Sequence, residues 1–368
     1  MAKLAALILA AGYGSRMGRF KPMLPLAGRR AIDWAVTGFR DAGIGSIRVV
    51  TGLGAAELEP ELRHLGVVGV RNQNYDRGMY SSVQVGMASL PDNVDACFLL
   101  PVDTPLVRAS TIAALAARYA EAPAPVIHPT FYGRRGHPPL IARELFAEIL
   151  AGDGNGGLRA LLQRHHAAEV AVADEAILLD MDTPDEHLRL AELARHRHLP
   201  SAEECEAILE LHGVAEPIRR HSRAVAAVAT TLADHLDDVE PQLVLAAGLL
   251  HDIVKGQPHH AEAGAALVAR LGYPEVAEVI RHHMDYDFGD GPPDAAAVVF
   301  IADKLVREDR LVVLESRFQP AFERYANEPE ALASARRKYV NARNVLETVE
   351  ACAGMSHAQI LSHCGVPA

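Results

Sequence analysis

A glycine-rich segment close to the N-terminus combines residue types that bind phosphate. It follows the apolar run Leu4–Leu9, contains Gly12 and Gly14, and brings two cations, Arg16 and Lys21. A glycine turn that leaves a buried strand lets backbone N–H groups surround phosphate oxygens, and the cations add positive charge there. The segment lacks the Gly-Lys-Ser/Thr of a Walker A loop, and its glycine spacing differs from the dinucleotide fingerprint. We therefore expect a phosphate site of a different kind.

Two aspartates downstream of this segment are candidate ligands for Mg²⁺. Asp103 follows the apolar run 97–100, Asp182 follows the run 177–179, and Thr-Pro comes directly after each aspartate. Mg²⁺ typically takes one or two protein carboxylates together with substrate phosphates. A lone Asp before Thr-Pro is more often a helix cap or a turn residue, but two of them behind a phosphate loop favour the metal. Asp180 could share this role, although Asp182 is the better candidate.

A polar segment between these motifs is a candidate for binding a nucleotide base or ribose. Residues 71–84 have low apolar content until a helix begins near Ser81. Functional loops often have this composition, and hydroxyls at a helix start can bind polar ligand edges. Ser81 as a helix cap is compatible with the same interpretation.

These motifs are expected to lie on an alternation of strands and helices that continues to about Ala194. Strands that are buried on both faces, with helices between them, predict an α/β domain with a doubly wound, mostly parallel sheet. In such sheets the ligand lies at the carboxyl ends of the strands, where the glycine segment and both aspartates fall. The predicted strands are Ala5–Leu9, Ile47–Thr51, Val67–Val70, Ala96–Leu100, Pro125–His128 and Ala176–Leu179, with helices at Ala31–Ala42, Ala55–Leu65, Ser81–Leu90 and Ser110–Ala120.

The pattern changes near Arg195–Ser201, a polar break that contains Pro200. Beyond it the periodicity is helical, and 10 of the 18 histidines follow Pro200. We therefore expect two domains, an α/β domain over residues 1–198 and an all-helical domain over residues 201–368.

Composition limits the classes of protein that fit. The 368 residues suggest two or three domains, and 49% hydrophobic with 23% charged residues is an ordinary globular composition. The net charge of −11 argues against a nucleic-acid surface. Four scattered cysteines suit a reducing cytoplasm, and the short N-terminal apolar run reads as a strand rather than a secretion signal. No run approaches the length of a membrane span, so we expect a cytoplasmic protein without a membrane or nucleic-acid partner.

The first half resembles the molybdenum cofactor cytidylyltransferases and their close relatives. The resemblance is carried by the segment from Leu9 to Lys21, Arg71-Asn72, Gly78-Met79, Ser81-Ser82, Asp103, Gly136-His137-Pro138, Gly152-Asp153-Gly154 with Arg159, and Asp182-Thr183-Pro184. Relatives that transfer guanylate have glycine at the position of Ala11, so the resemblance implies CTP. One departure concerns the acceptor segment, which in the family is a compact Gly-Asp-Gly-Gly-Ala-Arg and is longer here, over residues 152–159.

The resemblance implies transfer of CMP to a phosphorylated acceptor such as molybdopterin carrying molybdenum, with pyrophosphate leaving. Lys21 and Arg16 would stabilise the leaving phosphates, Asp103 and Asp182 would hold Mg²⁺, and an apo-molybdoenzyme is a possible partner. The implied acceptor-binding residues are His137 and Arg159, and His137 could equally serve to order its loop. The implied nucleotide-binding residues are Leu9, Ala10, Ala11, Gly12, Gly14, Arg16, Lys21, Asn72, Gly78, Ser81, Ser82 and Asp103.

Two alternatives stay open for this domain. One is a cytidylyltransferase for another acceptor, such as a sugar or polyol phosphate. The other is a protein that binds and delivers the cofactor without catalysis. The presence of both aspartates and of Lys21 favours catalysis.

The second half resembles the HD superfamily of metal-dependent phosphohydrolases, through His221, the adjacent His251-Asp252, and Asp303. Adjacent residues on a straight helix point about 100° apart. His251 and Asp252 can therefore share a metal only if each meets it from the side, with the other ligands supplied by other helices.

His260 and His283 are placed as in HD hydrolases that hold two metal ions, including those that cleave diadenosine tetraphosphate. The implied ligands are His221, His251, Asp252, His260, His283 and Asp303, with Asp252 bridging. Imidazole together with carboxylate suits Fe, Mn or Zn better than Mg²⁺ alone, and Lys255 would hold the substrate phosphate. His259 and His282 are weaker candidates, and the alternative is an inactive HD domain that serves dimerisation or docking.

Overall fold

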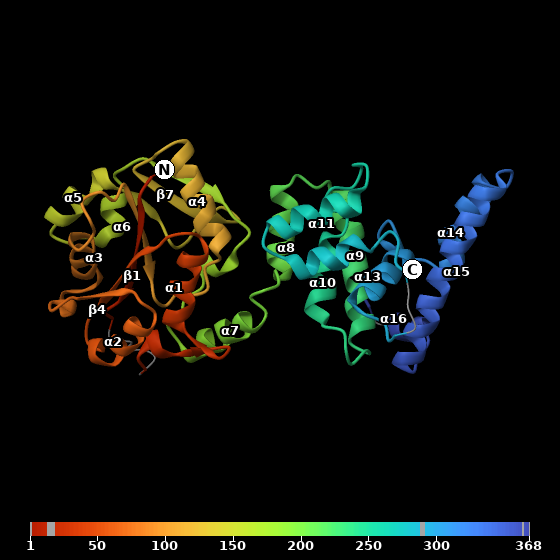
Figure 1. Cartoon of the computed structure of the whole chain (residues 1–368), viewed down its shortest axis with the longest axis horizontal. Coiled ribbons are helices and arrows are strands. Elements are labelled where there is room, and N and C mark those ends of the chain that lie inside the picture. Colours follow the sequence, from red (N-terminus) through yellow and green to blue (C-terminus); the bar gives the residue numbers. More distant parts are fainter. Residues whose placement is uncertain (1, 13–18, 288–290, 363, 368) are drawn as a thin grey trace. The chain divides into compact units, whose positions relative to one another are not determined.

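The computed structural model describes all residues except 1, 13–18, 288–290, 363 and 368. It divides the chain into two compact units, Met1–Arg197 and His198–Ala368 (Figure 1). Within the described residues, no helix combines the length and the apolar character needed to cross a membrane.

The first unit is built on a sheet of eight strands, which confirms the predicted α/β class with mostly parallel strands. Its strand order is β10-β7-β9-β6-β1-β4-β5, with β8 paired to β7. β9 runs antiparallel to both of its neighbours, whereas β1 is parallel to β4 and to β6. The strands are β1 (Leu4–Ala10), β4 (Ser46–Thr51), β5 (Val68–Arg71), β6 (Ala96–Pro101), β7 (Val126–Phe131), β8 (Arg134–Arg135), β9 (Leu140–Ala142) and β10 (Ala167–Ala171).

Helices cover both faces of this sheet (Figure 1). β1 alternates its buried side chains between the faces, so that Ala5, Leu7 and Leu9 share one core with Val83 and Phe146. That core belongs to the face covered by α3 (Met79–Ala88), α5 (Phe146–Ala151) and α6 (Gly157–Leu162). The other face carries α1 (Ala31–Asp41) and α4 (Ala109–Glu121), which pack against each other.

The remaining elements of this unit are short or lie at its periphery. They are η1 (Lys21–Met23), β2 (Pro25–Leu26), β3 (Arg29–Arg30), α2 (Ala55–His64), η2 (Tyr75–Arg77), η3 (Arg143–Leu145), η4 (Glu175–Leu178) and α7 (Pro184–Arg195).

The strand predicted over Ala176–Leu179 is wrong, because this segment forms the 3-10 helix η4. The amide of Leu179 donates to the carbonyl of Ala176, and the carbonyl of Ile177 accepts from the amide of His137. A short apolar run is buried equally well in a strand or in a helical turn, so its hydrophobicity could not distinguish the two. The edge strand β10 lies earlier instead, where the sequence alternates without a strong apolar run.

The second unit is helical, as predicted, apart from the two-stranded ladder of β11 (Val306–Arg307) and β12 (Arg310–Leu311). Its helices are α8 (Ala202–Leu211), α9 (Glu216–Ala233), α10 (Pro241–Leu250), α11 (His260–Arg270), α12 (Pro274–Arg281), α13 (Ala295–Leu305), α14 (Leu314–Arg324), α15 (Pro329–Ala353) and α16 (His357–Leu361).

Three of these helices form the centre of the second unit. The last ten residues of α13 are all buried, and α10 is apolar on nearly every side. α9 and α10 approach closely, since a Cβ placed on Gly248 would lie 2.7 Å from Cα of Ala226. This packing positions the ends of α9, α10 and α13, which carry the predicted metal ligands.

Candidate catalytic centres

Lys21 joins the two predicted metal-binding aspartates of the first unit. Its Nζ lies 2.5 Å from Oδ1 of Asp182 and 3.3 Å from Oδ2 of Asp103. All three side chains are partly buried. Residues separated by 82 and 161 positions in the sequence therefore converge on one point.

Each member of this triad is positioned by a defined element. Asp103 follows β6, and Lys21 begins η1. Asp182 directly precedes the N-cap of α7, where Thr183 and Glu186 form a reciprocal capping box. The Glu186 carboxylate also accepts a hydrogen bond from the Asp182 amide, at 3.0 Å. The Asp182 backbone is thus fixed by the helix that follows it.

The electrostatics of the triad favour a cation between the carboxylates. Burial lowers the pKa of Lys21, but the hydrogen bonds and charges of Asp182 and Asp103 outweigh it and raise the pKa above its usual value. Burial, together with the negative charges of Asp182, Glu186 and Asp103, raises the pKa of Asp180. In the described residues, no hydrogen bond joins Asp180 to Lys21.

The donor set fits Mg²⁺. Two carboxylates from different elements face one position, and the Lys21 ammonium marks that position as one that takes positive charge. Oxygen donors from one or two carboxylates, completed by substrate phosphates, are what Mg²⁺ prefers in proteins.

The predicted nucleotide-binding residues fall into four groups. Leu9 and Ala10 end β1, and Ala11 and Gly12 follow directly. Gly14 and Arg16 lie outside the described residues. Lys21 and Asp103 belong to the triad. The remaining residues, Asn72, Gly78, Ser81 and Ser82, lie around the start of α3.

Asn72, Ser81 and Ser82 are brought together at the start of α3. The fully buried Asn72 amide donates to the hydroxyls of Ser81 and Ser82, at 2.9 and 3.0 Å, and its carbonyl oxygen accepts from the Asn74 amide. Gly78 adopts a φ of +92° at the N-cap of α3, a conformation that favours glycine. This network fixes the loop. It also engages the side chains of Asn72, Ser81 and Ser82, which the sequence predicted to bind the nucleotide.

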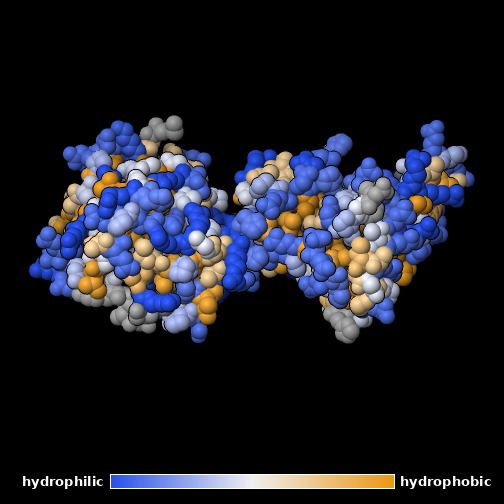
Figure 2. Space-filling model, turned by 60° about the horizontal axis from the view of Figure 1, so that its bottom comes forward, coloured by the Kyte–Doolittle hydropathy of each residue, from blue (hydrophilic) through white to orange (hydrophobic). Residues whose placement is uncertain are grey.

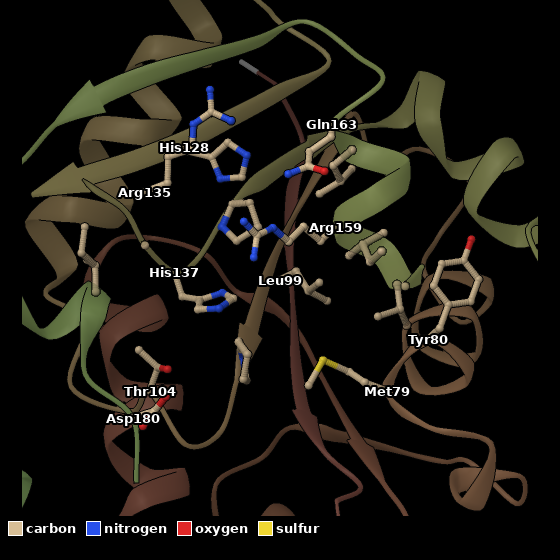
Figure 3. Close-up of a pocket in the computed structure, with 18 of the residues that line it drawn as sticks. Met79, Tyr80, Leu99, Thr104, His128, Arg135, His137, Arg159, Gln163 and Asp180 are labelled. Atoms are coloured by element: carbon tan, nitrogen blue, oxygen red, sulfur yellow. The ribbon is translucent and has the colours of Figure 1, made fainter. Parts of the chain in front are cut away.

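A cavity of 870 Å³ is lined by residues of β7, β8 and α6 and, at one end, by sequence neighbours of the triad (Figure 3). Thr104, next to Asp103, lines it together with Asp180, and both predicted acceptor residues, His137 and Arg159, also line it. Nδ1 of His137 is buried without a hydrogen-bond partner in the described structure. Burial lowers the pKa of His137, and the charge of Asp103 offsets part of this effect.

Several polar residues of this cavity were missed by sequence reasoning. They are His128, Arg134, Arg135 and Gln163, whereas Arg77 lies in the polar segment 71–84 that the sequence indicated. Arg134 and Arg135 directly precede the Gly136-His137-Pro138 motif, and that proximity was the available signal. His128 lay in a predicted strand, where alternation alone does not show which face reaches a cavity.

The second unit brings all six predicted HD ligands together. Nε2 of His221 lies 3.1 Å from Oδ1 of Asp303, and Nε2 of His251 lies 3.3 Å from Oδ2 of Asp252. Two donor groups could each hold a metal ion, and both include Asp252. They are His221, His251 and Asp252, and Asp252, His260 and His283.

Asp252 lies between the two donor groups. Its Oδ1 faces Nε2 of His260 at 3.5 Å and Nε2 of His283 at 3.8 Å, while its Oδ2 faces His221 and His251. The two carboxylate oxygens thus point to different groups, which is the arrangement expected of a bridging ligand.

Backbone carbonyls orient the imidazoles. Nδ1 of His221, His251 and His283 lies 2.7–2.8 Å from a carbonyl oxygen, of Glu308, Gly248 and Ile280 respectively. When Nδ1–H donates to a carbonyl, the Nε2 lone pair is left for a metal. Nε2 of His251 is buried and has no hydrogen-bond partner in the described structure. The donor set therefore fits transition metals that accept nitrogen and carboxylate ligands.

The pKa shifts of the clustered histidines also support a metal-binding role. Burial lowers the pKa of His251, but the carboxylates of Asp252 and Asp303 outweigh it and raise the pKa, so this point of the site favours positive charge. Burial lowers the pKa of His283 to about 4, which keeps its ring neutral. Lys255 reaches Asp252 from the partly exposed side, where a substrate phosphate could approach.

His259 and His282 lie outside this cluster. His259 is exposed at the N-cap of α11, and His282 contacts Glu278 at 3.2 Å.

Comparison with known proteins identifies both domains. Residues 6–170 match the model of the MobA-like NTP transferase domain, and residues 218–308 match that of the HD domain. The molybdenum cofactor cytidylyltransferase of Escherichia coli strain K12 is 27% identical over 195 residues, which cover 52% of this chain and 97% of that protein. The bifunctional protein GlmU of Trichlorobacter lovleyi is 35% identical over 128 residues, or 34% of this chain, and the match spans only 28% of its own length.

A solved Rv0371c homolog from Mycobacterium sp. strain JC1 is 26% identical, with coverage of 52% of this chain and 96% of that one and a TM-score of 0.46. The two family matches place a MobA-like NTP transferase domain and an HD domain in one chain.

Proposed function

We propose that the first domain transfers CMP from CTP to a phosphorylated acceptor, most simply molybdopterin carrying molybdenum, with release of pyrophosphate. The observation that carries this proposal is the convergence of Lys21, Asp103 and Asp182, whose sequence neighbours Thr104 and Asp180 line a cavity large enough for an acceptor. The similarity to the E. coli cytidylyltransferase over nearly its whole length supports the choice of substrates.

In this reaction a phosphate oxygen of the acceptor attacks the α-phosphorus of CTP, and the bond between the α-phosphorus and the bridging oxygen to the β-phosphate breaks. Asp103 and Asp182 would hold Mg²⁺, which when bound neutralises charge on the reacting phosphates. Lys21 stabilises the leaving pyrophosphate, and His137 and Arg159 orient the acceptor. Arg16 lies outside the described residues, and we assign it the same role, stabilising the leaving pyrophosphate, from its place in the sequence. Such chemistry depends on positioning and charge neutralisation more than on covalent help.

The test is incubation with each radiolabelled NTP, Mg²⁺, and molybdopterin or its molybdenum form. We expect transfer of CMP, a preference for CTP over GTP in direct competition, and a weaker preference in Ala11→Gly. Preferred use of GTP by the wild-type protein would overturn the choice of base.

The same assay with sugar and polyol phosphates tests the alternative acceptor. Binding of the cofactor without any transfer would instead support the delivery protein.

We propose that the HD domain is a metal-dependent phosphohydrolase that acts on a phosphoester or nucleotide. His221, His251, Asp252, His260, His283 and Asp303 would hold two metal ions such as Fe, Mn or Zn, which when bound supply an activated water and charge neutralisation. Lys255 holds the substrate phosphate at the accessible side. Six polar side chains that converge in a mostly buried site without a metal would carry a desolvation cost on the order of several kcal/mol.

In the full chain, His251→Ala with Asp252→Ala is expected to abolish transition-metal binding and hydrolysis while CMP transfer persists. Elemental analysis and transfer assays on the same preparation measure both. Protein that contains no metal after purification without chelator, and takes up none on reconstitution with Mn²⁺ or Fe²⁺, would point to a docking or dimerisation domain instead.

A further inference from the structure

The cavity of the transferase domain has two chemically different ends. Figure 3 shows Thr104 and Asp180 together at one end, and His128, Arg135 and Gln163 at the opposite end. The first end adjoins the catalytic carboxylates, so the reacting phosphate of the acceptor must lie there. The opposite end must therefore contact a different part of the same acceptor.

Positive charge in the cavity exceeds what one acceptor phosphate needs. Its lining includes four arginines, whereas Asp180 is the single carboxylate among the described lining residues. Arg135 pairs with Glu169 at 2.7 Å, yet even with Glu169 counted there are four guanidinium groups against two carboxylates. This excess is notable in a chain of net charge −11, because it cannot reflect a generally basic surface. The four arginines are Arg77, Arg134, Arg135 and Arg159.

Apolar side chains also line the cavity. They include Leu99, Pro139, Leu162, Ile177 and Leu179, and Figure 3 places Leu99 between the two ends together with His137 and Arg159. Hydroxyl groups that face the apolar side chains would lose their hydrogen bonds to water without replacement. A body that is partly apolar or planar fits this lining.

His128 contributes hydrogen bonding rather than charge at the far end. Burial and the neighbouring positive charge of Arg135 lower its pKa to about 4, so its ring is neutral at neutral pH. The cations of this end are therefore Arg134 and Arg135, which form strand β8. Guanidinium groups are well suited to carboxylate and phosphate ligands.

On the basis of the proposed transferase function, we infer that the acceptor carries a second anionic group, separated from the reacting phosphate by a partly apolar body, and that Arg134 and Arg135 bind this group. The inference narrows the acceptor class. It excludes simple sugar and polyol monophosphates, which lack the second charge.

The test uses two flexible probes that differ only in this second charge, hexane-1,6-diol monophosphate and hexane-1,6-diol bisphosphate. Their affinities for the full chain are measured by calorimetry with Mg²⁺ and α,β-methylene-CTP, which blocks transfer. We expect the bisphosphate to bind at least tenfold more tightly than the monophosphate. In the double variant Arg134→Gln with Arg135→Gln this difference should disappear, while the affinity for the monophosphate changes less than threefold.

Arg164→Gln is the matched control, because Arg164 follows α6 but does not line the cavity and pairs with Glu148 instead. This variant should keep the preference for the bisphosphate. Equal binding of the two probes, absence of binding by both, or a preference that survives in the double variant would each overturn the inference. Binding of α,β-methylene-CTP is measured first, so that its absence would count against the proposed function and not against the second anionic group.

Discussion

At the residue scale, Lys21 lies where the two carboxylates of the transferase site meet, at the position that a divalent cation would share. Asp103→Asn keeps the size of the side chain but cannot neutralise Mg²⁺ or the developing charge on phosphate. We expect CMP transfer to fall by about a hundredfold or more with little change in the melting temperature. Asp92→Asn, at an exposed carboxylate, serves as the control. Unimpaired transfer by Asp103→Asn with every NTP would remove Asp103 from the site.

Lys304 is a positioning residue that the sequence did not indicate. Its Nζ donates to Oδ2 of Asp303 at 2.7 Å and to the carbonyl of His283 at 3.1 Å, so one ammonium contacts two of the six proposed ligands. Lys304→Met should weaken Mn²⁺ binding by roughly tenfold or more, as loss of groups that orient ligands commonly does.

Titration with Mn²⁺ measures this effect, and melting of the metal-free protein reports any general loss of stability. Lys304→Arg should recover part of the affinity, whereas the exposed Lys338→Met should leave it unchanged. Wild-type affinity in Lys304→Met would show that the brace has no role in metal binding.

His128 gives the transferase cavity a predictable pH response. Its pKa is lowered from 6.5 to about 4 in the folded protein, mainly by burial. Between these values the unfolded chain binds a proton at His128 and the folded chain does not, so stability falls as pH falls through this window. NMR titration of labelled histidine should show an inflection near pH 4, assigned by its absence in His128→Asn.

The same variant should lose less stability between pH 7 and pH 5 than the wild type. His64→Asn, at an exposed position of α2, controls for the loss of a histidine. An inflection for His128 above pH 6 would contradict the burial argument.

At the element scale, the close approach of α9 and α10 sets the distance between His221 and His251. A Cβ at position 248 would lie 2.7 Å from Cα and 3.0 Å from the backbone nitrogen of Ala226, and neither atom can move without shifting a helix. Gly248→Ala should therefore destabilise the HD domain by about 1–3 kcal/mol, the usual cost of overpacking, and should reduce metal content.

Urea unfolding and elemental analysis test both effects. Gly291→Ala adds a methyl group where no atom of the described residues lies within 4 Å, and it should change neither stability nor metal content. A Gly248→Ala protein as stable and as metal-rich as the wild type would show that the helices can separate without consequence for the site.

At the scale of the whole molecule, the transferase carboxylates lie in the unit Met1–Arg197 and the HD ligands lie in the unit His198–Ala368. Each unit buries its own core, so each site is expected to form independently. Residues 201–368 expressed alone should fold, bind two metal ions, one per donor group, and hydrolyse a phosphoester. Circular dichroism, elemental analysis and a hydrolysis assay check these three properties. A fragment that folds only with the first unit present would contradict this independence.

The sequence by itself determined much of the architecture. The apolar run before the glycine segment predicted β1, and the 3.6-residue periodicity predicted α1 and α4 to within about a residue. Local patterns of this kind suffice because burial of one face follows directly from the spacing of apolar residues. The order of the HD residues in the sequence indicated a set of metal ligands through its resemblance to a known superfamily.

Only the tertiary structure decided which distant groups meet. Lys21 reaches Asp103 and Asp182 because the last residue of β6, the first residue of η1 and the first residue of α7 lie at the same edge of the sheet. No local sequence pattern encodes that convergence. The 3-10 turn at residues 175–178 replaced a predicted strand because its amides bond within the segment and its Ile177 carbonyl accepts from the loop amide of His137. Arg134 and Arg135 resemble an ordinary solvated turn in the sequence, and they belong to the cavity only because β8 folds back on β7. Long-range packing, rather than residue type, therefore fixed the shape of the acceptor site.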